Sequence, residues 1–148
     1  MLIRQMQVSD IEGAYEILCS SLDEIFVKEV FFLFITGWPS GQLVAVNEFG
    51  DIAGFLSGAR LTTDKSTISL FAVDPRYRKK GVGRRLMEEF RIRSMMDGRH
   101  NIQLELRDSN KIAAEFYKKM GFVPIEYLEN FYNDGGNAVR MICSVYRS

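Results

Sequence analysis

Hydrophobic and polar residues alternate along this chain with two periods, one typical of strands and one typical of helices. A half-buried strand is apolar at every second residue, whereas an amphipathic helix repeats its apolar residues every three or four positions. Strand-like alternation occupies residues 2–8, 43–47, 52–60, 66–73, 102–106, 122–128 and 138–146. Helix-like spacing occupies a segment that begins at residue 9, and residues 27–35, 81–96 and 110–120. The order βααβββαβαββ predicts an α/β (α+β) fold, a mixed sheet of six to seven strands with helices on both faces.

Residues that favour turns separate these segments. Glycine and proline between residues 36 and 41 stop the second helix, and Asp74-Pro75 ends a strand because proline cannot donate to the ladder. Ser9, followed three residues later by Glu12, has the spacing of a capping box at the start of the first helix. Since no repeat, linker or low-complexity segment interrupts the pattern, we expect a single domain over residues 1–148.

The composition narrows the class of protein. The 148 residues are 47% hydrophobic and 26% charged, which is enough apolar material for a globular core. Basic and acidic residues number 19 each, so the net charge is zero, and we expect neither a nucleic-acid binder nor a membrane-surface binder. Cys19 and Cys143 lack metal-type spacing and fit reduced thiols, and the N-terminus has no signal-peptide hydrophobic region. We therefore expect a cytoplasmic protein without a bound metal ion.

A glycine-rich turn, Arg78-x-x-Gly81-x-Gly83, lies between a predicted strand and a predicted helix. The first N–H groups of a helix have no partner within the helix, and glycines allow a phosphate to approach them closely. Six cations lie within ten residues of an otherwise neutral chain, namely Arg76, Arg78, Lys79, Lys80, Arg84 and Arg85. The turn therefore predicts a site for a phosphorylated ligand, and the alternative is a plain helix start with a solvated basic face. A dinucleotide fold is disfavoured because the turn follows a β-meander, and a P-loop because Gly-Lys-Ser/Thr is absent.

The segment 73–87, Val-Asp-Pro-Arg-Tyr-Arg-Lys-Lys-Gly-Val-Gly-Arg-Arg-Leu-Met, resembles the acetyl-CoA signature of the Gcn5-related N-acetyltransferase (GNAT) superfamily. The similarity spans nearly the whole chain, from Ile3-Arg4-x-x-x-x-x-Asp10 to the last strand. It implies that acetyl-CoA is the cosubstrate and that its pantetheine arm bonds the backbone of Phe71, Ala72 and Val73. The implied contacts to its pyrophosphate are the backbone amides of Arg78, Lys79, Lys80, Gly81, Val82, Gly83 and Arg84.

A second segment, residues 104–122, resembles the family's signature Asn-x-x-Ala-x-x-x-Tyr-x-x-x-Gly-Phe. The resemblance implies that Asn110 contacts the pantetheine side of acetyl-CoA and that Tyr117 lies near its sulfur. Glu105 matches the glutamate that serves as base in ribosomal-protein-alanine N-acetyltransferases. The sequence thus favours Tyr117 and Glu105 as catalytic residues.

The chemistry of direct acetyl transfer needs these residue types. The amine must be neutral, and a tyrosine hydroxyl, with a pKa of about 10, can protonate the departing thiolate. One alternative is that Tyr117 is a core residue in an apolar helical stripe. The stripe would also contain Ile112, Ala113, Phe116 and Met120. Glu105, which alternates with two leucines, could equally occupy the polar face of its strand.

The segment 129–141 is similar to a tyrosine-bearing run in protein N-terminal acetyltransferases, where that loop covers the peptide entry. The resemblance implies that Tyr132 forms one wall of an acceptor site and Phe26 the opposite wall. Phe131 and Asn137 depart from the family's tyrosine and aspartate at those positions. At pH 7.5 an α-amine is roughly one-third neutral, whereas a lysine side chain is only about 0.1% neutral. We therefore expect an enzyme that acetylates protein or peptide N-termini.

Two other functions stay open on the sequence. One is acetylation of a small amine such as a polyamine, for which carboxylates would come from Glu24, Glu29, Glu126 and Glu129. The other is a catalytically silent acyl-CoA-binding module, against which the presence of both candidate catalytic residues argues. The sequence also leaves open whether the chain forms a homodimer.

Overall fold

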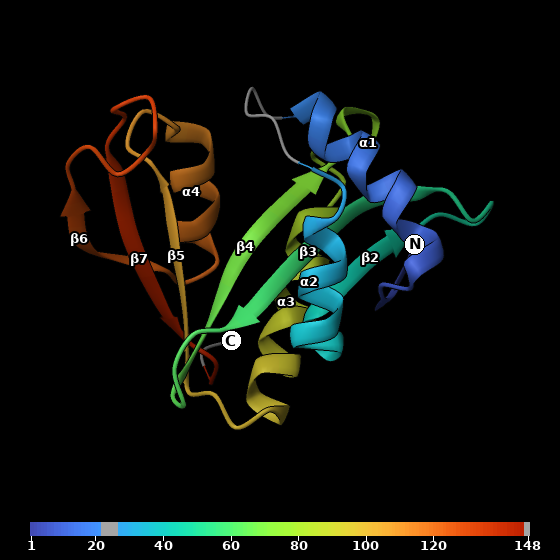
Figure 1. Cartoon of the computed structure of the whole chain (residues 1–148), viewed down its shortest axis with the longest axis horizontal. Coiled ribbons are helices and arrows are strands. Elements are labelled where there is room, and N and C mark those ends of the chain that lie inside the picture. The colour runs from blue at the N-terminus through green and yellow to red at the C-terminus, as the bar shows by residue number, and fades with distance from the viewer. Residues whose placement is uncertain (22–26, 147–148) are drawn as a thin grey trace.

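The computed structural model describes residues 1–21 and 27–146, and within them one sheet is flanked by helices (Figure 1). The strands are β1 (Leu2–Gln5), β2 (Gln42–Val46), β3 (Ile52–Arg60), β4 (Lys65–Val73), β5 (Asn101–Arg107), β6 (Val123–Leu128) and β7 (Ala138–Ser144). The α-helices are α1 (Ile11–Ser21), α2 (Val30–Gly37), α3 (Val82–Met96) and α4 (Lys111–Lys119). Their order along the chain is consistent with the order predicted from the hydrophobic pattern.

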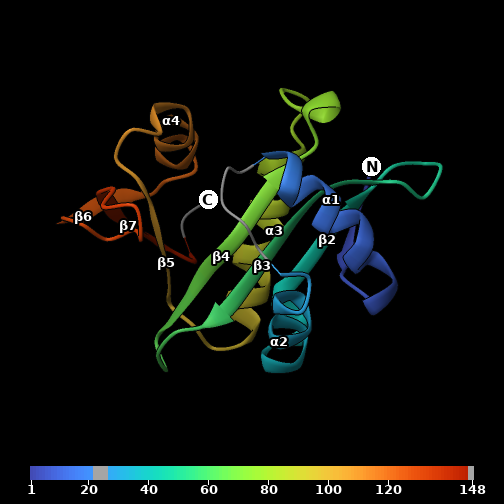
Figure 2. The ribbon, with the colours of Figure 1, turned by 45° about the horizontal axis from the view of Figure 1, so that its top comes forward.

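The strands form a mixed sheet in the spatial order β1-β2-β3-β4-β5-β7-β6. Neighbouring strands are antiparallel except for β4 and β5, which run parallel and are connected through α3. Helices α1 and α2 lie on one face, and α3 and α4 lie on the other (Figures 1 and 2). The predicted mixed sheet with helices on both faces is therefore confirmed.

Each face of the sheet has its own hydrophobic core. Towards α3, the side chains of Leu86 and Phe90 are fully buried and belong to the same cluster as Leu56 of β3. Towards α2, Phe31 packs edge-to-face on Phe55 with ring centroids 5.4 Å apart. The helical period seen in the sequence thus corresponds to the helix faces that bury apolar surface against the sheet.

The two central strands, β4 and β5, pair over only three residues, 65–67 with 101–103. Beyond that point they diverge (Figures 1 and 2), so that residues 68–73 pair with β3 alone and residues 104–107 with β7 alone. A register shift on β4 skips Ser69, and such a bulge bends a strand. We call residues 68–73 and 104–107 the diverging ends. Within the described residues no strand pairs with them on the sides that face each other, so a ligand could bond their backbone there, although the Val73 carbonyl accepts a hydrogen bond from Nε of Arg78 at 3.4 Å.

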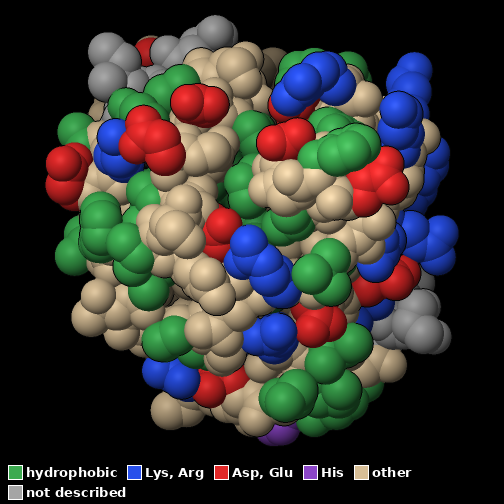
Figure 3. All heavy atoms as spheres, turned by 90° about the vertical axis from the view of Figure 1, so that its right-hand side faces the viewer, with side chains coloured by type: hydrophobic (Ala, Val, Ile, Leu, Met, Phe, Trp, Pro, Cys, Tyr) green, Lys and Arg blue, Asp and Glu red, His purple; other side chains and the backbone are tan. Residues whose placement is uncertain are grey.

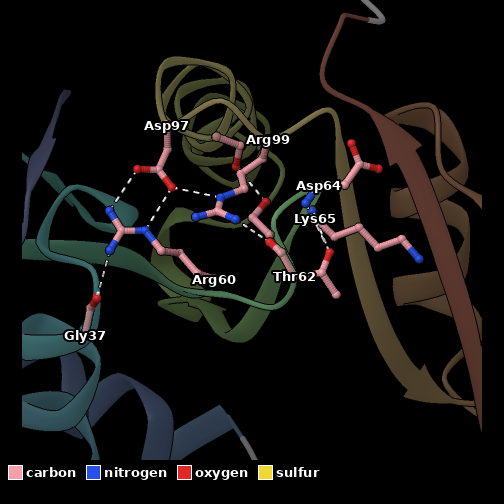
Figure 4. Close-up of polar contacts among 9 residues, drawn as sticks. Gly37, Arg60, Thr62, Asp64, Lys65, Asp97 and Arg99 are labelled. Atoms are coloured by element: carbon pink, nitrogen blue, oxygen red, sulfur yellow. Dashed lines mark hydrogen bonds and ion pairs between the residues drawn. The ribbon is translucent and has the colours of Figure 1, made fainter.

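The paired beginnings of β4 and β5 are held by ion pairs at one end of the molecule (Figure 4). Asp97, directly after α3, accepts hydrogen bonds from Arg60 at 2.8 and 2.9 Å and from Arg99 at 2.9 Å. Arg99 also donates to the carbonyl of Thr62, in the turn between β3 and β4. The hydrogen bonds from Arg60, with a smaller contribution from Arg99, lower the pKa of Asp97 to about 2. We call Arg60, Asp97 and Arg99 the closed-end cluster.

The first helix begins differently from the prediction. A 3-10 turn, Val8–Asp10, precedes α1, and it is Asp10 that accepts a hydrogen bond from the Gln7 N–H, at 2.8 Å. Asp10 also pairs with Arg4 at 2.7 Å, whereas Glu12 pairs with the side chain of Lys28 at 2.6 Å. The predicted capping box of Ser9 and Glu12 is therefore wrong, because Glu12 is engaged elsewhere.

The surface is mixed in character. Basic, acidic and apolar side chains are interspersed over most of the face in Figure 3, as a net charge of zero would suggest, with Lys and Arg denser along its right-hand edge. Within residues 1–21 and 27–146, none of the helices has the length and apolar character that crossing a membrane requires.

Candidate active site

The glycine-rich turn lies between β4 and α3. Gly81, the residue before α3, has a φ of 81°, and Lys79 also has a positive φ, 61°. A Cβ at Gly81 would meet no atom within 4 Å, so its left-handed backbone, and not crowding by the protein, explains the glycine. Within the described chain the amides of Val82, Gly83 and Arg84 form no hydrogen bond. These N–H donors form the positive end of the α3 dipole, and they point out of the helix, where they could bind a diphosphate.

The cations of this turn differ in their partners. Arg76 pairs with Asp74 at 2.9 Å, and Arg84 pairs with Glu88 at 3.0 Å. In the part of the chain that the structure describes, four of the six cations have no carboxylate within ion-pair distance, namely Arg78, Lys79, Lys80 and Arg85, and Arg85 instead donates to the carbonyl of Met1 at 2.7 Å. The positive charge available to a phosphorylated ligand is therefore concentrated on the residues just before Gly81.

A hydrogen bond between Asn47 and Tyr77, which the sequence did not predict, holds the glycine-rich turn in place. The side-chain nitrogen of Asn47, at the end of β2, donates to the hydroxyl of Tyr77 at 2.8 Å. The oxygen of the same side chain accepts the N–H groups of Phe49 and Asp51, each at 2.9 Å. The β2–β3 turn thus fixes the residue that immediately precedes Arg78, and no local pattern could have linked two residues thirty positions apart.

Phe71, Ala72 and Val73 form the diverging end of β4. Their partners on β3 are Leu56, Phe55 and Gly54. No described strand pairs with them on the side towards β5, which is the side that a pantetheine arm would need. The three residues therefore occupy a position that suits the role the family resemblance implies for them.

Tyr117 lies on α4 beside the diverging end of β4. Its ring packs edge-to-face against Phe71 at 6.4 Å, Phe116 at 5.3 Å and Phe122 at 5.5 Å between centroids. The hydroxyl forms no hydrogen bond with any described residue, and burial raises the pKa of Tyr117. The group is therefore protonated at neutral pH and able to donate its proton or a hydrogen bond.

Asn110 lies at the start of the same helix. Its side-chain oxygen accepts the N–H of Ala113 at 3.1 Å and so caps α4. This leaves the amide NH2 of Asn110 as the group that could contact a ligand. The proposed apolar stripe of α4 is only partly correct, because Ala113, Phe116, Tyr117 and Met120 pack against the core whereas Ile112 is 87% exposed.

Glu105 lies on the opposite face of the sheet from Tyr117. Its neighbours Leu104 and Leu106 are buried in the core on the α4 side, so the side chain of Glu105 projects to the other face. There its Oε2 accepts hydrogen bonds from Arg140 at 2.9 Å and from Gln103 at 3.0 Å. Its Oε1 accepts none from a described residue. One carboxylate oxygen is thus fixed, and the other is available to take a proton.

Arg140 was not predicted from the sequence. It is paired with Glu105 across β5 and β7, and it also donates to Glu126 of β6 at 2.7 Å. These hydrogen bonds, the one with Glu105 contributing most, raise the pKa of Arg140. The contact depends on strand register between residues 35 positions apart, which periodicity alone does not define.

Of the two residues predicted to line the acceptor site, the structure describes Tyr132 but not Phe26. Tyr132 lies in the loop between β6 and β7, with the guanidinium of Arg107 4.2 Å from its ring centroid. Asn137 closes this loop, because its side-chain oxygen accepts the N–H of Asn130 at 3.0 Å. Phe26, the predicted opposite wall, lies outside the described residues.

The site combines two features on the two faces of a sheet whose central strands diverge. A protonated tyrosine and free helix amides suit a thioester joined to a diphosphate, and a carboxylate on the other face suits a second substrate. This arrangement is consistent with a coenzyme A-dependent transferase. The model of the acetyltransferase (GNAT) domain matches residues 22–145, and the chain belongs to that family. It is an N-acetyltransferase that uses acetyl-CoA as the acetyl donor.

Known proteins resemble the chain over nearly all of its length. A Bacillus subtilis protein assigned as a ribosomal protein bS18-alanine N-acetyltransferase is 29% identical, over 90% of this chain and 88% of that protein. N-alpha-acetyltransferase 30 of Xenopus laevis is 30% identical over 93% of this chain, but the chain spans only 50% of that relative. The crystal structure of Ard1 from Thermoplasma volcanium has a TM-score of 0.93 at 35% identity, covering 99% of this chain and 98% of that one.

Proposed function

We propose that this enzyme acetylates the α-amino groups of protein or peptide N-termini by direct attack on acetyl-CoA. The observation that carries the proposal is the position of Glu105, whose free oxygen lies on the sheet face opposite Tyr117. The acceptor amine and the acetyl donor can then approach the diverging ends from opposite sides. The two relatives described above, one named for ribosomal-protein alanine and one for N-alpha acetylation, support this acceptor class.

The proposed roles of the chain's own residues follow from this placement. Acetyl-CoA supplies an acetyl group as a thioester. Glu105 removes a proton from the amine, directly or through a water molecule, as the nitrogen–carbon bond forms. Tyr117 gives its hydroxyl proton to the sulfur as the carbon–sulfur bond breaks, and both groups regain their starting states by exchange with solvent. The amides of residues 82–84, together with Arg78, Lys79 and Lys80, hold the pyrophosphate.

The cofactor roles of the remaining predicted residues are part of the same proposal. The backbone of Phe71, Ala72 and Val73 binds the pantetheine arm, and Asn110 contacts it from the start of α4. On the acceptor side, Tyr132 lines the peptide entry. No covalent enzyme intermediate is needed, since Cys143 is buried and Cys19 lies on α1.

A polyamine acceptor is less well supported by the charges of the site. Such a ligand needs several carboxylates that are not neutralised, but Glu126 is paired with Arg140 at 2.7 Å. Glu24 lies outside the described residues. Among the three described candidates, Glu29, just before α2, and Glu129, after β6, form no ion pair with a described residue.

The test is a thiol-release assay with acetyl-CoA against peptides with free N-termini, matched N-terminally blocked peptides that contain lysine, and polyamines. We expect release with the free N-terminal peptides and little with the blocked ones, because the α-amine is far more often neutral. A preference for polyamines over every peptide would overturn the proposed acceptor. Thiol release with none of the amines, despite acetyl-CoA binding, would indicate a silent binding module.

A further inference from the structure

We propose that Arg107 is a positioning residue for the acceptor. Its side chain holds the loop between β6 and β7 in place and takes no part in acetyl transfer. The proposal rests on the proposed function, in which this loop lines the acceptor entry. We call residues 129–137 the acceptor loop, and Arg107, Tyr132 and Asp134 the open-end cluster.

The position of Arg107 links the catalytic strand to the acceptor loop. It is the last residue of β5 and follows Glu105 by two positions, so both side chains project from the same face of the sheet. Its guanidinium lies 4.2 Å from the ring centroid of Tyr132 and pairs with Asp134 at 3.1 and 3.2 Å. A single side chain thus contacts both an aromatic and an acidic residue of the loop, Tyr132 and Asp134.

The acceptor loop is built around the same contact. Asp134 accepts the N–H of Gly136 at 2.9 Å, and this hydrogen bond, followed by that from Arg107, lowers the pKa of Asp134. The N–H of Tyr132 donates to the Gly136 carbonyl at 3.0 Å, and the N–H of Gly135 donates to the Tyr132 carbonyl at 2.9 Å. The charge on Asp134 that attracts Arg107 therefore also fixes the turn of the loop.

Gly136 shows how closely the guanidinium fits against the loop. A Cβ at this position would lie 2.4 Å from Nη1 of Arg107, closer than real Cβ contacts. The backbone of Gly136 is not left-handed, so conformation does not require a glycine there. The absence of a side chain at residue 136 instead leaves space for Arg107.

The cofactor side should not respond to the side chain of Arg107. Only its backbone carbonyl contacts Asn110, by accepting the Asn110 N–H at 3.0 Å. A substitution at Arg107 keeps this bond, and with it the start of α4. The side chain should therefore affect the acceptor and not acetyl-CoA, which is a distinction that kinetics can resolve.

The first experiment compares steady-state constants of Arg107→Met with those of the native enzyme, using the best acceptor in the thiol-release panel. Methionine keeps the apolar stem and removes the charge and the planar fork. We expect the acceptor KM to rise about 5- to 20-fold, with kcat changed less than about threefold and the acetyl-CoA KM unchanged. Arg107→Lys keeps a cation but not the fork, so the rise should be smaller, about 2- to 5-fold.

The matched control is Arg60→Met. Arg60 also lies over an aromatic ring, 5.7 Å from the centroid of Trp38, and also pairs with an aspartate, Asp97 at 2.8 Å. It lies in the closed-end cluster, away from the acceptor loop, so its loss should leave the acceptor KM unchanged. An equal rise in both variants would overturn the proposal, because the effect would then follow from general destabilisation.

A second variant removes the contact while the arginine stays. In Gly136→Ala the guanidinium of Arg107 must move, and the carboxylate of Asp134, whose Oδ1 would lie 2.9 Å from the new Cβ, must shift slightly; both are flexible ends of side chains, so the protein should stay folded. We expect the acceptor KM to rise in the same direction as in Arg107→Met. The double variant should be little worse than Arg107→Met alone, because methionine leaves no guanidinium to displace and only the smaller shift of Asp134 remains. Additive effects would contradict a shared contact.

Hydrogen exchange tests the loop without any acceptor. The amides of Tyr132 and Gly135 should exchange faster in Arg107→Met than in the native protein, and at native rates in Arg60→Met. Unchanged exchange in Arg107→Met overturns the proposal, as does faster exchange with an unchanged acceptor KM. Because exchange needs no acceptor, failure of the proposed N-terminal acceptor class would appear only in the panel assay and would be distinguishable.

Discussion

The two ends of the molecule contain the same kind of contact in different surroundings. In the closed-end cluster Arg60 lies over Trp38, which is 1% exposed, and in the open-end cluster Arg107 lies over the partly buried Tyr132. The first joins α3 to the turn between β3 and β4, where β4 and β5 still pair. The second joins the end of β5 to a loop, where the strands have already diverged.

The role of such a contact therefore depends on the elements that it connects. At the closed end it links elements that the sheet and the core already hold together, so it should contribute to stability. At the open end it links a rigid strand to a loop with little buried surface, so it should determine where the loop lies. Substitutions at the open end should therefore change kinetic constants, and those at the closed end should change stability.

The largest expected effect is that of Tyr117→Phe. Phenylalanine keeps the ring contacts with Phe71 and Phe122 and removes only a hydroxyl that has no described partner, so stability should hardly change. If Tyr117 protonates the thiolate, kcat should fall about 100-fold or more, with the acetyl-CoA KM unchanged. Stopped-flow or steady-state thiol release measures this, and an unchanged kcat would assign Tyr117 to the core alone.

The next effect is that of Glu105→Gln, which keeps the shape and removes the proton acceptor. At pH 7 the acceptor kcat/KM should fall about 10- to 100-fold, and it should recover partly at higher pH as more of the amine becomes neutral. Glu126→Gln is the matched control, since Glu126 binds the same Arg140 from β6 but is not beside the diverging ends. If both variants behave alike, the ion-pair network and not a base is what matters.

A smaller effect is expected at the glycine-rich turn. Because Gly81 has space around it but a φ of 81°, the shape of the backbone should decide which residues are tolerated. Gly81→Val should raise the acetyl-CoA KM about 10-fold, whereas Gly81→Asn should raise it less than about threefold, since asparagine adopts this conformation more readily. Equal KM values for the two variants would favour steric blocking of the ligand over backbone strain.

Much of the fold could be predicted because it follows from local patterns. The helical period of α3 identifies Leu86 and Phe90 as buried, and Asp74-Pro75 marks the end of β4. The divergence of β4 from β5 could not be predicted, since it follows from a register shift at Ser69 and from pairing between distant strands. The turn at Gly81 was recognised, but its left-handed backbone is visible only in the structure.

In the candidate site, too, the sequence predicts what depends on local motifs but not what depends on contacts between distant residues. Glu105 and Tyr117 lie within recognisable sequence motifs, so both could be predicted as site residues from the sequence. Their positions on opposite faces depend on which residues of β5 face the core, and the partners Arg140 and Arg107 depend on strand register and loop shape. Contacts between residues 25 to 35 positions apart carry no local signal, which is why these two arginines were missed.

The smallest expected effect concerns the closed end and appears in stability alone. The pKa of Asp97 is lowered to about 2, chiefly by Arg60, so its carboxylate stabilises the fold above the unfolded pKa of about 4. This contribution should be lost as the pH falls from about 4 to about 2, and it should amount to about 1–2 kcal/mol. Asp97→Asn should therefore lower the free energy of unfolding in urea at pH 6 by that amount, and the difference from the native protein should vanish near pH 2. The kinetic constants at pH 7 should stay the same, because Asp97 lies in the closed-end cluster and not at the acceptor loop. A changed acceptor KM would show that the two ends are coupled through β4 and β5 and would remove the distinction between them.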